Sequence, residues 1–137
     1  MNSNARPQIK GLCPLIQVFD MRTSLAFYRD VLGFQVVEQA PSGDDCDWVW
    51  LTLGDAGLML NTRYEAPNRP AARSPEWIAA HDDICFYIGA PDVDAMCNYL
   101  RARGLEVTPP KVAPYGMKQL YLKDPDGYGI CFQWPTS

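Results

Sequence analysis

The sequence predicts an α+β protein built from two copies of one β-α-β-β-β plan. Residues 20–37 read as the end of a strand, an amphipathic helix, a glycine stop and a new strand, and residues 91–107 repeat that order. Tyr28 and Tyr99 lie 71 residues apart, each five residues before a glycine. Because one copy cannot bury its sheet alone, the two copies must pack on each other or on a second chain. The seam between them is a natural place for a ligand pocket.

Length and composition exclude several classes of protein. A chain of 137 residues has the size of one domain, and its hydrophobic content of 47% is that of a globular protein. The net charge of -4 argues against a nucleic-acid-binding protein, which presents a basic face. Apolar runs are strand-sized, so no membrane span is predicted, and the first residues lack the plan of a signal peptide. Five cysteines without a CxxC pair fit a reduced, cytoplasmic location.

The first module is expected at residues 11–62, after a flexible N-terminus at 1–10. Residues 12–19 are strand-like, and a helix over 22–32 buries Leu25, Tyr28, Val31 and Leu32 at helical spacing. Either Asp20 or Thr23 is its N-cap, and Gly33 ends it. Strands follow at 34–39, 48–53 and 58–62, with the turn of the last hairpin at 54–57.

Residues 63–80 are expected to link the modules, with one helical turn at 75–80 and a lid or rim role typical of long connections. The second module, at 81–137, begins with a strand at 83–89 and a helix over 93–103. Strands at 105–107, 117–123 and 128–134 complete it, and the last two join through Asp124-Pro-Asp-Gly127, whose residue types favour a turn. The two modules make one compact domain.

These motifs resemble the vicinal oxygen chelate superfamily, which includes glyoxalase I, extradiol dioxygenases, and fosfomycin and bleomycin resistance proteins. The resemblance rests on 18–20, 24–28 and 32–34 at the start, on 115–118, and on 124–128 followed by 130–134 at the end. It spans about residues 12–134. It implies paired βαβββ modules whose curled mixed sheets surround a central cavity, usually in a homodimer.

In metal-dependent members of that superfamily, His, Gln or Glu ligands from both modules line the cavity. By resemblance, the four positions fall at Cys13, at Met59, at Asp83 or alternatively Cys85, and at Cys131. Thiol and thioether groups do not suit a hard divalent ion that activates oxygen substrates. The preferred interpretation is therefore a metal-free cavity whose floor these side chains fill, with no cofactor. A soft-metal site from Cys13, Met59 and Cys131 is the alternative.

Five further residues are expected to contact a ligand. Trp48 and Trp50 share one face of their strand, where they form either part of the core or a stacking wall for a planar or cationic molecule. Gln17 and Gln133 lie on the cavity side if Cys13 and Cys131 do. Tyr115, like Trp134, flanks the closing hairpin as an aromatic residue of the pocket, the dimer seam or a packed edge. The neighbouring Asp44, Asp45 and Asp47 are expected to be a solvated loop rather than an acidic rim.

The sequence therefore favours a homodimeric protein that binds or sequesters a small organic, antibiotic-like molecule in an aromatic-lined cavity. A metal-dependent lyase, isomerase or dioxygenase with a non-standard metal site is the second hypothesis. A third hypothesis is a thiol-based protein in which Cys13 and Cys131 form a redox pair, although buried inert thiols are more common. Histidine-based acid–base catalysis has almost no candidate, because His81 is the single histidine.

Overall fold

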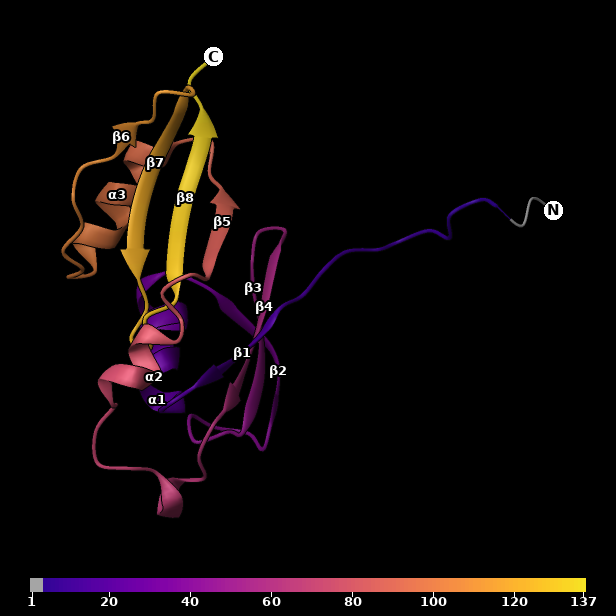
Figure 1. Ribbon diagram of the computed structural model, residues 1–137, viewed down its shortest axis with the longest axis vertical. Coiled ribbons are helices and arrows are strands. Elements are labelled where there is room, and N and C mark those ends of the chain that lie inside the picture. Colours follow the sequence, from indigo (N-terminus) through magenta and orange to yellow (C-terminus); the bar gives the residue numbers. More distant parts are fainter. Residues whose placement is uncertain (1–3) are drawn as a thin grey trace.

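The first module of the computed structural model contains a four-stranded sheet covered on one side by a helix (Figure 1). The structure describes residues 4–137. The sheet has the strand order β1-β4-β3-β2, with β1 parallel to β4 and the other pairs antiparallel. The elements are β1 (Leu15–Val18), α1 (Met21–Leu25), the π-helical turn η1 (Ala26–Val31), β2 (Gln35–Ala40), β3 (Trp48–Leu53) and β4 (Ala56–Thr62).

The second module repeats this topology after a linker. Its sheet has the order β5-β8-β7-β6, again with one parallel pair, β5 with β8. The elements are η2 (Ala66–Asn68) and α2 (Pro75–Ala79) in the linker, then β5 (Cys85–Gly89), α3 (Val93–Ala102), β6 (Lys111–Val112), β7 (Met117–Lys123) and β8 (Gly129–Pro135). The predicted α+β class and the two βαβββ modules are confirmed. Within the described residues, no helix is long and apolar enough to cross a membrane.

The first helix begins where the sequence indicated and then widens. Asp20 is the N-cap, since its carboxylate accepts a hydrogen bond of 3.1 Å from the Arg22 backbone N–H. From Ala26 the helix continues as a π-helical turn, in which the Leu32 N–H donates to the Phe27 carbonyl at 2.9 Å. Gly33 then ends the helix with φ of +94°, a conformation that disfavours other residues.

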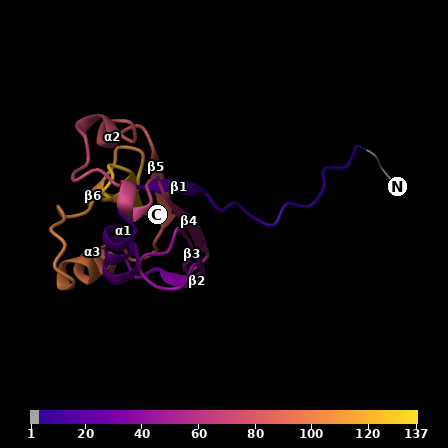
Figure 2. The ribbon, with the colours of Figure 1, turned by 90° about the horizontal axis from the view of Figure 1, so that it is seen from below.

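Buried side chains from both modules form one hydrophobic core. Tyr28, Leu25 and Leu60 of the first module and Leu100 and Phe132 of the second are each at most 1% exposed and belong to the same cluster. Figure 2 shows α1 and α3 on one side of β2, β3 and β4. The core therefore lies on the helical side of each sheet, and the opposite face of each sheet remains open.

The linker is fastened to the turn between β7 and β8 by a buried carboxylate. Asp126, which is fully buried, accepts hydrogen bonds from Arg73 Nε at 2.8 Å and from Trp77 Nε1 at 2.9 Å. It also accepts longer ones, 3.4 Å, from the Phe19 N–H and the Ser24 hydroxyl of the first module. One side chain of the second module thus holds both the linker and the first module.

Two tyrosines and the histidine strengthen this junction. The Tyr28 hydroxyl donates to Asp124 at 2.6 Å, and burial raises the pKa values of both groups. The Tyr128 hydroxyl donates to the Gln17 carbonyl at 3.0 Å. His81 stacks on the Tyr128 ring at 4.0 Å, and its Nδ1–H donates to a backbone carbonyl of the turn at 2.6 Å. The linker therefore packs against the junction between the two modules.

Three expected elements differ from the structure. Residues 105–107 are not a strand, because the Leu105 N–H and the Val107 carbonyl bind the end of α3 instead; the edge strand is β6. The strand expected from residue 83 begins at Cys85, because the Ile84 N–H closes a turn with the His81 carbonyl at 3.1 Å. The first strand is shorter than 12–19, and residues 4–12 run as an exposed segment away from the body (Figure 1).

Candidate functional site

The open face of the first sheet carries both expected tryptophans. Val49 and Leu51 of β3 are fully buried in the core, so Trp48 and Trp50 project from the other face. The strand register places Trp50 in a row with Met59 and Leu15, and Trp48 in a row with Asn61 and Gln17. Among the expected contacts, the structure thus brings Gln17, Trp48 and Trp50 onto one face.

Cys13 lies at the edge of this face, beside an indole. A side-chain carbon placed on Gly57 would lie 3.4 Å from Cys13 Sγ and 3.8 Å from Trp50 Nε1. The thiol and the indole N–H therefore both lie next to Gly57. Cys13, Trp50 and Gly57 line one hollow of about 430 Å³ at the end of the β3–β4 hairpin.

The open face of the second sheet carries a tyrosine pair over a buried thiol. Tyr87 of β5, Cys131 of β8 and Tyr121 of β7 form one row across the strands. The two phenol oxygens are hydrogen-bonded at 2.9 Å, and the rings meet edge to face. Cys131 is fully buried, and burial raises the pKa of its thiol. The row therefore exposes phenol groups on the surface of the sheet, and its thiol is shielded.

A row of amides continues this face toward the C-terminus. Gln119 Nε2 donates to the Tyr115 hydroxyl and to Gln133 Oε1, both at 2.9 Å. The expected contacts Tyr115 and Gln133 are thus held together by Gln119, which sequence reasoning missed. The two-residue period of β7 could have found it, because Gln119 and Tyr121 share one face of that strand.

The positions that correspond to family metal ligands do not assemble into one metal site within the chain. Cys13 and Met59 lie on the open face of the first sheet, and Cys131 lies on that of the second. Asp83 is exposed in the turn before β5, and Cys85 begins that strand. Within residues 4–137, no three His, Cys, Asp or Glu side chains are close enough to hold an ion. Thiol and thioether side chains that lie on two different faces do not fit a hard divalent metal.

The acidic loop between β2 and β3 does not form a rim on the tryptophan face. Arg22 Nε contacts Asp45 at 2.7 Å, and Arg29 contacts Asp44 at 2.8 Å, so both carboxylates are paired with the first helix. The hydrogen bonds from these arginines lower the pKa values of Asp44 and Asp45. The loop is tied to the helical side of the module.

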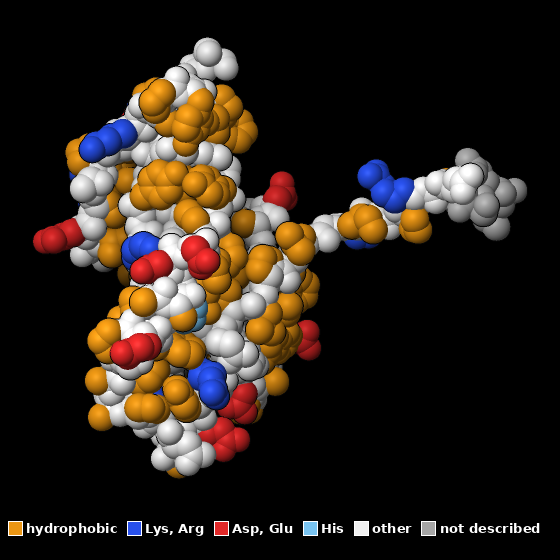
Figure 3. Space-filling model, in the orientation of Figure 1, with side chains coloured by type: hydrophobic (Ala, Val, Ile, Leu, Met, Phe, Trp, Pro, Cys, Tyr) orange, Lys and Arg blue, Asp and Glu red, His pale blue; other side chains and the backbone are white. Residues whose placement is uncertain are grey.

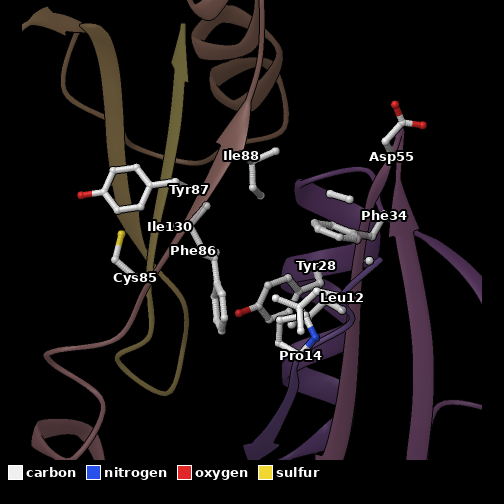
Figure 4. A pocket seen from close by; sticks show the side chains of 13 residues that line it. Leu12, Pro14, Tyr28, Phe34, Asp55, Cys85, Phe86, Tyr87, Ile88 and Ile130 are labelled. Carbon is white, nitrogen blue, oxygen red and sulfur yellow. The ribbon is translucent and has the colours of Figure 1, made fainter. Parts of the chain in front are cut away.

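The two open faces point away from the shared core in different directions. Inward residues of both sheets belong to one shared core, so each open face points outward from it. Figure 4 shows Cys85 and Tyr87 turned away from the first module, whereas Phe86 and Ile130 point toward it. Figure 3 shows apolar patches across β5, β7 and β8, and on the open face Tyr87 and Tyr121 are 54% and 49% exposed. One chain therefore presents two separate open faces that carry exposed aromatic side chains.

Comparison with known proteins agrees with this architecture. The sequence profile of the Glyoxalase/Bleomycin resistance protein/Dioxygenase superfamily matches residues 12–132. No curated protein sequence matches the chain.

Several solved structures share the fold. TioX from Micromonospora sp. ML1 is 18% identical, with 90% of this chain and 97% of that chain covered and a TM-score of 0.70. A bleomycin-binding protein complexed with bleomycin is 18% identical, with 91% and 98% covered and a TM-score of 0.67. A glyoxalase/bleomycin resistance protein from Streptomyces sp. CB03234 is 25% identical, with 89% and 97% covered and a TM-score of 0.60.

Proposed function

The chain belongs to the Glyoxalase/Bleomycin resistance protein/Dioxygenase superfamily, and from this premise we propose that it binds small organic molecules between two copies of itself. The observation that carries the proposal is the presence of exposed aromatic side chains on both open faces. Trp50 is 36% exposed, and Tyr87 and Tyr121 are about half exposed. Large exposed aromatic groups at the centre of a sheet face favour an interface or a ligand site.

A twofold dimer brings the two kinds of face together. If the tryptophan face of one protomer covers the tyrosine face of its partner, the twofold axis makes the same contact a second time. Each protomer then contributes one wall to each of two equal cavities. Trp48, Trp50 and Gln17 form one wall, and Tyr115, Tyr121 and Gln133 form the other.

The chemistry of these walls indicates the class of ligand. Indole and phenol rings bind planar or cationic groups through their faces, and the amides orient polar groups by hydrogen bonds. Glu38, which lies in the row of Trp50 and Met59, adds an acidic group to the first wall. A similar structure that holds bleomycin supports an antibiotic-sized ligand as one member of this class. Cys13, Met59, Asp83 and Cys131 then act as floor and rim positions rather than metal ligands.

A mixing experiment tests the shared cavity. Light scattering first measures whether the protein is a dimer, and a thermal-shift screen of antibiotics and aromatic metabolites identifies a ligand, because binding to the native state raises the melting temperature. Trp50→Ala and Tyr121→Ala should each abolish binding. When the two variants are unfolded together and refolded, mixed dimers contain one intact cavity, so about one quarter of the sites should recover.

A matched control uses two substitutions that both lie on the tryptophan face. A mixture of Trp48→Ala and Trp50→Ala chains should recover no sites, because every cavity then has a damaged tryptophan wall. Recovery in both mixtures, or in neither, would contradict a cavity shared between protomers. Stoichiometric metal that remains bound through purification and is lost in Cys131→Ala would favour the metal-dependent enzyme instead.

A further inference from the structure

A second pocket lies between the two modules of one chain, along the outer strand β5 of the second sheet (Figure 4). Its volume is about 300 Å³. Tyr28, Phe34 and Leu58 line it from the first module, and Phe86, Ile88 and Ile130 line it from the second. At Asp55 and Gly57 it adjoins the hollow beside Trp50, whereas Trp48 and Tyr121 line neither of these two hollows.

The floor of this pocket is rigid, and its walls are apolar. Tyr28, Phe34 and Ile130 are at most 3% exposed and belong to the core, so the floor is fixed by packing. Phe86 and Ile88 are only partly buried against the core. They come from β5, whose alternation turns Cys85 and Tyr87 to the other side of the strand, where these two residues line the rim of the pocket. The junction thus leaves an apolar hollow that the chain itself does not fill.

The pocket has one charged residue in its lining, and that residue is acidic. Asp55, in the turn between β3 and β4, is the one charged residue among the described residues that line it. The Tyr28 hydroxyl is already committed to Asp124 as a donor. Aromatic rings attract a cation through their faces, and a carboxylate at the mouth adds to that attraction.

We propose that this pocket binds a small aromatic cation, a single ring with a short ammonium side chain. The volume lies at the lower end of ligand pockets, which limits the occupant to about one ring and a few further atoms. The ring occupies the apolar hollow, and the ammonium group lies toward Asp55. Because the pocket is formed within one chain, its occupancy does not depend on the dimer.

The test uses benzylamine and benzoate, which share a ring and differ in charge. Protein with labelled Ile, Leu and Met methyl groups is titrated with each probe and followed by NMR. Benzylamine should shift the methyl signals of Leu58, Ile88 and Ile130 in a saturable way and leave those of Leu15 and Met59 on the open face unchanged. Benzoate should bind about tenfold more weakly.

Two variants separate this pocket from the open faces. Ile88→Trp fills the hollow and should abolish the benzylamine shifts, whereas Trp48→Ala, on the open face of the first sheet, should leave them intact. Asp55→Asn, in an exposed turn that does not contribute to the core, should bring the affinities for the two probes close together. Saturable shifts at Leu15 and Met59 instead, equal binding of both probes by the unmodified protein, or no saturable shift at all would each overturn the proposal.

Discussion

Replacing Asp126 with Asn tests whether one buried carboxylate holds the two modules and the linker together. The substitution keeps the size of the side chain and removes its charge. Asp126 is fully buried, and its ion pair with Arg73 Nε is 2.8 Å long. Removing one partner of a buried pair costs about 3–5 kcal/mol. The Arg73 side chain is 22% exposed, so water can partly solvate it. The expected loss in free energy of unfolding is therefore about 3 kcal/mol.

Urea denaturation followed by circular dichroism measures this loss, and the melting temperature should fall by about 10 °C. The matched control is Asp82→Asn, because Asp82 is 65% exposed and lies 3.7 Å from Lys123 Nζ. An exposed pair of that kind contributes at most about 1 kcal/mol.

A double-mutant cycle with Arg73→Met then isolates the ion pair. If Asp126→Asn lowers the free energy of unfolding no more than Asp82→Asn does, or if the cycle shows no coupling, then Asp126 does not hold the linker and the two modules together.

Three further predictions concern a glycine, a phenol and the thiols. Gly127→Ala should destabilise the protein more than Gly104→Ala: both glycines have φ near +90°, but only at Gly127 would the new carbon lie 2.7 Å from a backbone oxygen of α2. Equal losses in urea would contradict this. Burial, and then the two carboxylates of the turn, raise the pKa of Tyr128 to about 12. The unfolded phenol loses its proton near pH 10, so stability is retained below that pH and lost as the pH rises toward 12. Tyr128→Phe should weaken this dependence, and an unchanged slope of unfolding free energy against pH would refute it. Cys13 should react with iodoacetamide before Cys131, which is fully buried, and peptide mass spectrometry would expose the reverse order.

The parts of the fold that sequence predicted well are those where alternation is strict. The strands Trp48–Leu53 and Met117–Lys123 have the predicted bounds, because every second side chain in their centres is apolar and enters the core. The helix of the second module begins at the predicted Val93 because Asp92 caps it. Residues 105–107 were predicted wrongly because their apolar pattern suits the core without requiring a strand partner.

The candidate site was less accessible to sequence reasoning for a physical reason. Alternation places Trp48 with Trp50, and Cys131 with Gln133, but it does not say how the two sheets are oriented around the core. That orientation depends on contacts between distant parts of the chain, such as those of Asp126, whose partners Phe19 and Arg73 lie 107 and 53 residues away. The sequence therefore predicts which residues share a face and not which faces meet.

The outer strands β2 and β6 affect whether copies of this protein can join edge to edge into filaments. In the first sheet the outer strand β2 carries an irregularity between Val36 and Glu38 that interrupts its register. In the second sheet the outer strand β6 is two residues long. Interrupted or very short outer strands are poor templates for adding a further chain. Copies of this protein should therefore not assemble into filaments by pairing at β2 or β6, which form one edge of each sheet.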